Sequence, residues 1–174
     1  MRNATVTCVA PTGTVSLLAG TSSGIEPFFA LAVSRRMLDG RVFVEVNPQL
    51  AAALATLGSA GEAALAAARE HGSIRSVAEA LPETVRRRFP IALEIAPEVH
   101  VRMQAAFQAH IDAAVSKTVN LSADAPVGAV RSIYGLAAQL HLKGITVYRY
   151  GSRPGQVLSL AHEASRHDCR ECAV

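Results

Sequence analysis

The pattern of apolar and polar positions divides the first half of the chain into short elements separated by turn residues. Alternating apolar positions over a few residues favour strands, whereas apolar positions repeated every three or four residues favour helices. Pro11-Thr12-Gly13 and Asp39-Gly40 are typical turn signals. The expected elements are a strand at residues 5–10, a helical turn at 14–19, a loop at 20–27, strands at 28–33 and 41–46, and helices at 49–57, 60–71, 73–80 and 82–88.

The second half shows a clearer alternation of helix and strand. Pro97 and Glu98 are typical of a helix start, because proline suits the first turn and an acid is favourable beside the positive end of the helix dipole. The predicted buried stripe of this helix is Val99, Met103, Ala106, Phe107 and Ile111. The expected elements after it are a strand at residues 115–121, a helix at 127–142 that buries Val130, Ile133, Tyr134, Ala137 and Leu140 or His141, a stop at Gly144 and a strand at 145–150. This order predicts an α/β fold with parallel strands.

Composition narrows the class of protein. Of the 174 residues, 50% are apolar and 18% are charged, which excludes a disordered chain. The net charge of +3 comes without a basic stripe interleaved with aromatic residues, so we expect no nucleic-acid partner. Arg86-Arg87-Arg88 is interpreted as a solvated helix end, with a phosphate patch as the less common alternative.

Targeting signals are also absent from the sequence pattern. The first residues lack the apolar core of a signal peptide, and the apolar stretch at 51–68 is broken by glycines. We therefore expect a cytoplasmic protein with no membrane partner. The three cysteines are then expected to be reduced.

A turn with phosphate-binding chemistry follows the first expected strand. Pro11, Thr12, Gly13, Thr14 and Ser16 place a glycine turn and hydroxyl residues at the start of a helix. The free N–H groups of a helix start favour an anion, and hydroxyls add donors. The alternative is an ordinary helix start capped by Thr12 or Thr14. The residue types leave both interpretations open.

The loop after this helix is a candidate second wall of the same anion site. A helix this short returns the chain close to Thr12, and the loop offers Ser22, Ser23 and Glu26. The alternative is a plain connecting loop with a Ser-Gly turn.

Two cysteines near the end of the chain form a Cys-x-x-Cys pair. Cys169 and Cys172 suit a redox dithiol or half of a zinc site. His162 and His167 are near enough in the sequence to complete a set of four zinc ligands. Zinc modules usually separate their two ligand pairs by a dozen or more residues, so the spacing favours the redox interpretation. An incidental pair at the end of the chain is the third possibility. We expect no metal site.

Other candidate residues have ordinary explanations. Cys8 is expected to be a small buried thiol in the first strand. His100, His110 and His141 are expected at surface or boundary positions of helices. Lys117 lies on an apolar strand, so its ammonium must reach solvent, an acid or a bound anion.

Taken together, several strings resemble the catalytic subunit of ribonucleotide reductase. The later strings are most similar to the adenosylcobalamin-dependent (class II) enzymes. The resemblance covers nearly the whole chain, in the expected order, through residues 2–5, 10–14, 22–27, 97–108, 114–120, 143–149 and 151–153.

The resemblance implies a fold and roles for the candidate residues. It implies that residues 1–153 are the C-terminal part of a ten-stranded α/β barrel, incomplete on its own, and that 154–174 are a flexible tail. It further implies that residues 11–16 bind the phosphates of a ribonucleotide substrate. Cys169 and Cys172 would re-reduce the active-site disulfide after each turnover, and a thioredoxin-like protein would in turn reduce these two cysteines. Adenosylcobalamin would be the cofactor, with its binding determinants mostly outside this chain.

The chain departs from the family pattern in two ways. The family's radical cysteine lies in an Asn-x-Cys-x-Glu stretch, which this sequence does not contain, and Cys8 lacks the required neighbours. Tyr150 stands where the family usually has an acid before Gly-Ser-Arg.

The expected function is therefore a part of a vitamin B12-dependent ribonucleoside-diphosphate reductase. It would help to reduce ribonucleotides to deoxyribonucleotides by a thiyl-radical mechanism, and it would be inactive alone. An N-terminal reductase half on another polypeptide would complete it. The alternatives are a non-catalytic truncated fragment and a nucleotide-phosphate or zinc-binding module.

Overall fold

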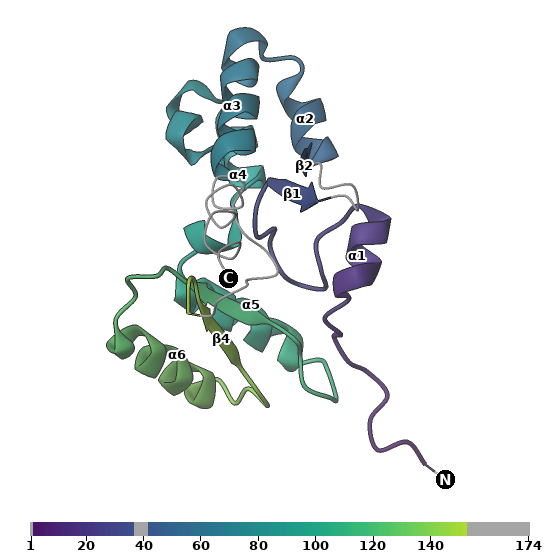
Figure 1. Ribbon diagram of the computed structural model, residues 1–174. Coiled ribbons are helices and arrows are strands. Elements are labelled where there is room, and N and C mark those ends of the chain that lie inside the picture. Colours follow the sequence, from purple (N-terminus) through teal and green to yellow (C-terminus); the bar gives the residue numbers. More distant parts are fainter. Residues whose placement is uncertain (1, 37–41, 153–174) are drawn as a thin grey trace, which may run out of the picture. The chain divides into compact units, whose positions relative to one another are not determined.

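The computed structural model describes residues 2–36 and 42–152, which fall into two compact units (Figure 1). Unit 1 contains the described residues of Met1–Phe28 and Ala92–Pro154, and unit 2 contains those of Phe29–Ile91. The tail predicted at residues 154–174 and its cysteines lie outside the described residues. Each unit is considered by itself below.

Unit 2 combines a β-hairpin with a group of short helices. Strands β1 and β2 pair antiparallel, with Ala32 opposite Val46. The predicted strand at 41–46 is confirmed, whereas the one at 28–33 is displaced toward the C-terminus. The elements are β1 (Ala32–Arg36), β2 (Val42–Val46), α2 (Pro48–Leu54), α3 (Gly58–His71), the 3-10 helix η1 (Arg75–Ala80) and α4 (Glu83–Arg88).

Local chemistry explains where the helices of unit 2 begin and meet. The side chain of Asn47 accepts hydrogen bonds from the N–H groups of Gln49 and Leu50, which caps α2. A Cβ added to Gly61 would lie 2.2 Å from the carbonyl oxygen of Leu54, so glycine is required where α3 approaches α2. The core contains Leu31, Leu50, Leu54, Ala64 and Ala68.

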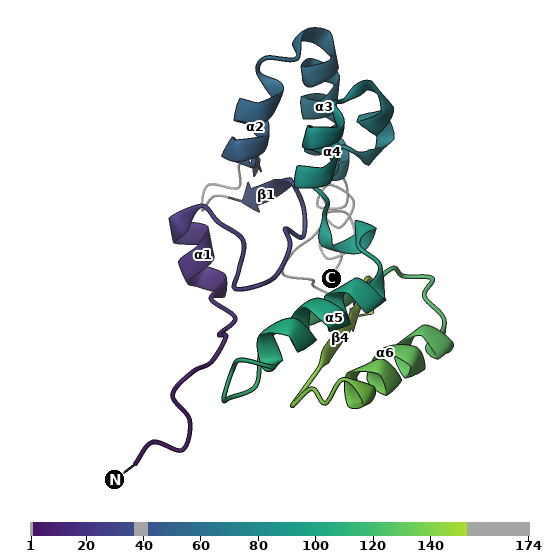
Figure 2. The same cartoon turned by 180° about the vertical axis from the view of Figure 1, so that it is seen from behind.

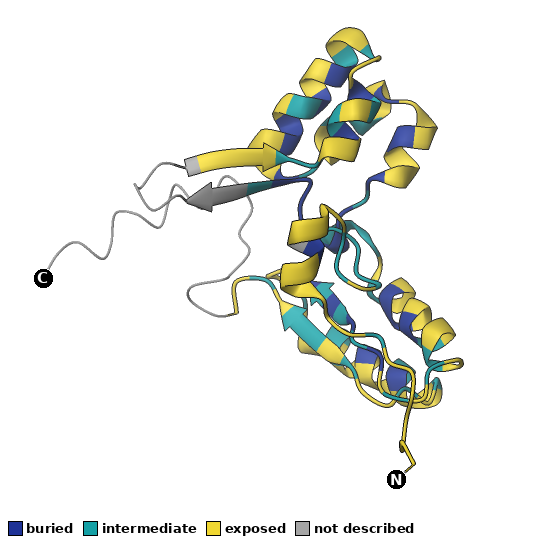
Figure 3. Ribbon diagram, turned by 90° about the vertical axis from the view of Figure 1, so that its right-hand side faces the viewer, coloured by how far each residue is buried: buried dark blue, intermediate teal, exposed yellow. Residues whose placement is uncertain are grey.

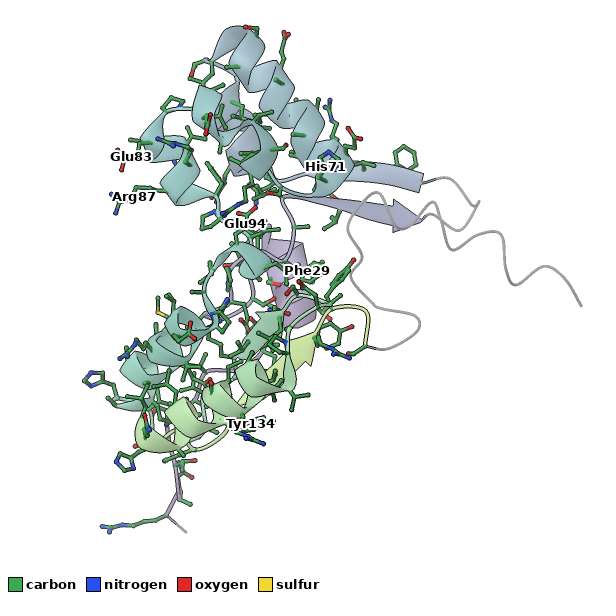
Figure 4. All side chains as sticks on the ribbon, turned by 90° about the vertical axis from the view of Figure 1, so that its left-hand side faces the viewer. Phe29, His71, Glu83, Arg87, Glu94 and Tyr134 are labelled. Carbon is green, nitrogen blue, oxygen red and sulfur yellow. The ribbon has the colours of Figure 1, made fainter. Side chains whose placement is uncertain are left out.

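The arginine triplet lies in the last turn of α4. All three side chains belong to exposed residues, and Arg87 lies 3.5 Å from Glu83 one turn earlier (Figure 4). Basic side chains at this end complement the helix dipole. The interpretation of residues 86–88 as a solvated helix end is confirmed.

Unit 1 packs two helices against a short parallel sheet. Strands β3 and β4 pair in parallel, with Thr118 opposite Thr146, which confirms the predicted parallel pairing for these two strands. Helices α5 and α6 lie side by side beside β4 in both Figure 1 and Figure 2. The elements are α1 (Gly13–Ala19), the 3-10 helix η2 (Ala92–Glu94), α5 (Pro97–Gln108), β3 (Thr118–Leu121), α6 (Val127–Gln139) and β4 (Thr146–Arg149).

Apolar side chains from three elements build the core of unit 1. Figure 3 shows buried positions along the inner sides of α5 and α6. Tyr134 is an exception to the prediction, because it is 51% exposed and points away from α6 (Figure 4). The buried core residues are Val101, Val119, Leu121, Ile133 and Ala137.

The predicted buried stripe of α5 is wrong in phase. Val99, Met103 and Phe107 are exposed, whereas His100, Val101 and Gln104 are buried. The buried amide of Gln104 donates to the carbonyl oxygens of Val115 at 2.9 Å and Gly144 at 2.8 Å. The amide N–H group of Gln104 can be buried because these two backbone carbonyl oxygens accept its hydrogen bonds.

The first expected strand contributes only one bridge. Val9 pairs in parallel with Val115, and the other residues of 5–10 are not assigned to a strand. The carboxylate of Asp112 accepts from the N–H groups of Val6 and Thr7, and the Thr7 hydroxyl accepts from the Asp112 N–H at 2.9 Å. Side-chain contacts therefore replace part of the expected ladder. Within the described residues, no helix is both long enough and apolar enough to cross a membrane.

Candidate functional site

The start of α1 exposes most of the residues that the sequence singled out, but Ser16 is buried, with 6% of its surface exposed. Thr12 has a φ of 52°, in the left-handed region. The N–H of Ser16 donates to the carbonyl oxygen of Thr12 at 2.8 Å. This is the first helical bond, so the N–H groups of Gly13, Thr14 and Val15 precede the helical ladder. Thr12, Gly13 and Thr14 are exposed, as is Pro11 before them. The turn therefore offers donors to solvent.

The following loop folds back onto this helix start, as its sequence predicts. The Thr12 hydroxyl accepts from the N–H of Gly24 at 2.9 Å, so it binds across the loop. The Ser16 hydroxyl donates to the carbonyl oxygen of Gly13 and lies 2.8 Å from the Ser23 hydroxyl. The structure thus brings Thr12, Gly13, Ser16 and Ser23 together, with Ser22 in the same loop.

Glycine is required at position 24 for two reasons. Its φ is 49°, in the region that side chains rarely adopt. An added Cβ would also lie 2.9 Å from the carbonyl oxygen of Ala10. The loop and the segment before α1 therefore approach each other closely at this glycine.

Glu26 and Lys117 form an ion pair in unit 1, in which the lysine is buried and the glutamate partly buried. The Lys117 ammonium donates to Glu26 Oε2 at 2.7 Å, and the side chains are 1% and 22% exposed. The N–H of Thr118 donates to the other carboxylate oxygen, Oε1, at 2.5 Å. Of the partners expected for Lys117, an acid is the one present. The sequence indicated that Lys117 needed a partner but did not indicate which one.

His100 is part of the core, and the expectation that it lies at the surface is wrong. It is 1% exposed, and its Nε2 lies 3.0 Å from the carbonyl oxygen of Ala92. Burial lowers the pKa of His100, and the positive charge of Lys117 lowers it further. A buried carbonyl partner explains why a histidine can occupy this position. No periodic signal in the sequence distinguishes it from the other helical histidines. His110 and His141 are exposed, as predicted.

The cysteines divide between one described residue and the tail. Cys8 is exposed, so the prediction of a buried core thiol is wrong. The cause is that its segment forms a single bridge at Val9 and is not enclosed on both sides. Cys169 and Cys172 lie outside the described residues.

The described residues offer little that fits a metal or a corrin cofactor. They contain no group of three or more histidine, cysteine or acidic side chains able to hold a metal ion. The enclosed imidazole of His100 already has a carbonyl partner and is unavailable to cobalt. The described residues therefore offer no ligand that can be assigned to the cobalt of adenosylcobalamin.

Comparisons with known proteins agree on one family. Residues 1–148 match the family model described as ribonucleotide reductase, barrel domain. The chain is 54% identical over 160 residues to a vitamin B12-dependent ribonucleoside-diphosphate reductase of Mycobacterium tuberculosis, covering 92% of this chain and 22% of that protein. It is 45% identical over 159 residues to the enzyme of that name from Thermoplasma acidophilum, covering 91% and 20%.

A solved structure supports the same fold. The class Id ribonucleotide reductase alpha subunit of Actinobacillus ureae matches with a TM-score of 0.62 and 21% identity, covering 81% of this chain and 25% of that one. The chain spans about a fifth of the length of the curated relatives. Accordingly, the part that the structure describes contains two two-stranded sheets and no closed barrel. The chain belongs to the ribonucleotide reductase family and carries part of its barrel domain.

Proposed function

We propose that this chain supplies the substrate-phosphate site of a vitamin B12-dependent ribonucleotide reductase. The observation that carries the proposal is the contact between the α1 start and the following loop, through Thr12 with Gly24 and Ser16 with Ser23. These contacts gather donors within the segment that matches the reductase barrel domain. In this account the site lies in the C-terminal part of a ten-stranded barrel.

The chemistry of the segment supports binding of a polyanion. The N–H groups of Gly13 and Thr14 precede the helical ladder, and the exposed hydroxyl of Thr14 is a further donor. The hydroxyl of Ser16 donates to the carbonyl oxygen of Gly13 and so supports the turn from within. Pro11 fixes the backbone before the turn, because its φ is restricted. In this proposal Ser22 and Ser23 form the side wall.

The proposed reaction is supported by family membership and by the tail cysteines. Reduction of the ribose consumes two electrons, which a dithiol supplies by becoming a disulfide. Cys169 and Cys172 would pass these electrons to the active site and would be re-reduced by a thioredoxin-like protein in the cytoplasm. The sequence lacks the family's Asn-x-Cys-x-Glu stretch, so the radical cysteine would come from another part of the reductase.

Adenosylcobalamin would generate that radical, since the curated relatives are named vitamin B12-dependent. In this proposal its binding determinants lie mostly outside this chain. No role of the residues named above depends on contact with the cofactor. An N-terminal reductase part is the required partner, and the isolated chain is expected to be inactive.

Calorimetric titration of the full chain with pyrophosphate tests the phosphate site. Thr14→Val removes an exposed hydroxyl donor and Ser16→Ala removes the hydroxyl that supports the turn. Together the two changes are expected to weaken binding by about tenfold, since each tenfold loss corresponds to about 1.4 kcal/mol. Thr21→Val is the matched control, because Thr21 is exposed in the same loop but outside the proposed site. Equal weakening by the control variant, or no effect of the double variant, would refute the site.

A further inference from the structure

We propose that Glu26 and Lys117 are a positioning pair that fastens the loop of residues 20–27 to the start of β3. The pair would thereby hold the α1 start in its binding geometry. This inference rests on the proposed function, because it concerns the same phosphate site. It adds two residues that do not touch the substrate.

Both oxygens of the Glu26 carboxylate are occupied by donors from consecutive residues. Oε2 accepts from the Lys117 ammonium at 2.7 Å, and Oε1 accepts from the Thr118 N–H at 2.5 Å. Two bonds to one strand fix both the position and the orientation of the carboxylate. Charge-assisted bonds of this kind are among the stronger ones in proteins.

A continuous set of hydrogen bonds leads from Glu26 to α1. The N–H of Glu26 donates to the carbonyl oxygen of Ser23 at 2.8 Å, and the Ser23 hydroxyl lies 2.8 Å from the Ser16 hydroxyl. Between them, the N–H of Gly24 donates to Thr12 at 2.9 Å. Movement of Glu26 away from β3 would therefore disturb the contacts of the loop with Thr12 and with Ser16.

Burial makes the fastening strong, because Lys117 has little access to water. Its side chain is 1% exposed, and an unpaired ammonium at such a position is costly. The neighbouring buried His100 cannot replace the carboxylate, because it provides no negative charge. The loop therefore cannot detach without leaving Lys117 unpaired. This requirement selects the attached loop over open conformations.

Amide hydrogen exchange of the full chain tests the fastening without any ligand. Glu26→Gln is expected to speed exchange of the Gly24 amide by about tenfold or more, while the Tyr150 amide, which donates to Leu121 in the same unit, keeps its rate. Glu98→Gln is the matched control, since Glu98 is exposed on α5. An unchanged Gly24 rate, or an equal rise at Tyr150, would overturn the inference.

A second variant protects the test against misfolding. Glu26→Asp keeps the charge but shortens the side chain by one methylene. It is expected to speed exchange at Gly24 by about threefold and to leave Tyr150 unchanged. No change at Gly24 in this folded variant would also count against the fastening role.

Pyrophosphate titration separates this inference from the proposed function. Glu26→Gln is expected to raise the dissociation constant by about tenfold, whereas Lys117→Arg, which keeps the charge, is expected to stay within about threefold of the original chain. Binding to the original chain with no loss in Glu26→Gln would overturn the positioning role alone. Absence of binding to the original chain would refute the proposed function, and the exchange measurement would still decide whether the loop is fastened.

Discussion

The carboxylate of Glu26 lies 2.7 Å from the ammonium of Lys117, although 91 positions separate the two residues in the sequence. The pair joins the loop after α1 to the strand β3, which belong to one compact unit. The ion pair therefore connects an early segment of the chain to the central sheet of that unit. Its consequences for stability can be measured directly.

Removing either partner of this pair is expected to destabilise the chain unequally. Glu26→Gln leaves a buried ammonium without its counter-charge, at a cost of about 3 kcal/mol in unfolding free energy. Lys117→Met leaves a partly exposed carboxylate that keeps the Thr118 N–H, so a cost of about 1 kcal/mol is expected. Urea unfolding of both variants and of the double variant measures this. A double variant whose loss equals the sum of the single losses would contradict coupling between the two residues.

Lower pH is expected to destabilise unit 1 through His100. Burial and the Lys117 charge lower the pKa of His100, and the unfolded state titrates near pH 6.5. Between those two pKa values the unfolded state binds more protons. The contribution of neutral His100 to the free energy of unfolding is therefore complete above about pH 6.5, and it declines as the pH falls toward the pKa of the folded state.

Urea unfolding at pH 7.5 and pH 5.5 checks this expectation. His100→Gln is expected to reduce the pH dependence over this interval, whatever its effect on stability at pH 7.5. His110→Gln is the matched control, because His110 is exposed. A pH dependence that persists unchanged in His100→Gln would assign the effect to another group.

Substitution of Gly24 is expected to disturb the loop. Gly24→Ala combines an unfavourable positive φ with a Cβ 2.9 Å from the Ala10 carbonyl oxygen, so a loss of about 1–3 kcal/mol is expected. Gly135→Ala lies within α6 with no atom near the new methyl group, and a gain of about 0.5–1 kcal/mol is expected there. Thermal unfolding of the two variants provides the comparison. Equal shifts of both variants would contradict the close approach at Gly24.

The N-terminal segment is expected to depend on the ionised form of Asp112. The N–H of Val6 and the hydroxyl of Thr7 lower the pKa of this carboxyl. The contribution of the Asp112 carboxylate to stability is therefore present above the pKa of the unfolded state, about 3.9, and it is lost as the pH falls through the pKa of the folded state. Asp112→Ala should speed amide exchange at Val6 and Thr7 at neutral pH. Asp124→Ala, an exposed acid in the same unit, should leave those amides unchanged.

Helical periodicity predicted where most of the helices lie but not which side of α5 is buried. The apolar residues Val99, Met103 and Phe107 share one face, yet it is His100 and Gln104 on the adjacent face that are buried. Those polar side chains meet carbonyl oxygens of Ala92, Val115 and Gly144, which lie 8 to 40 positions away. Periodicity reports on local spacing and contains no information about such distant acceptors.

The candidate site was predicted in part for a similar reason. The shortness of the expected helix indicated that the loop returns to Thr12, and the contact with Gly24 agrees. The need of Lys117 for a partner could be predicted, because a buried ammonium is costly when unpaired. The identity of Glu26 as that partner required the fold, since the two residues are brought together only by packing of the loop against β3.

Backbone nuclear magnetic resonance of the full chain during titration with pyrophosphate tests the central claim most directly. The account predicts saturable shifts of the amides of Gly13, Thr14, Ser16 and Ser23, with little change at Arg86-Arg87-Arg88. Shifts concentrated at the three arginines, or no saturable shift at millimolar pyrophosphate, would contradict a phosphate site at the start of α1.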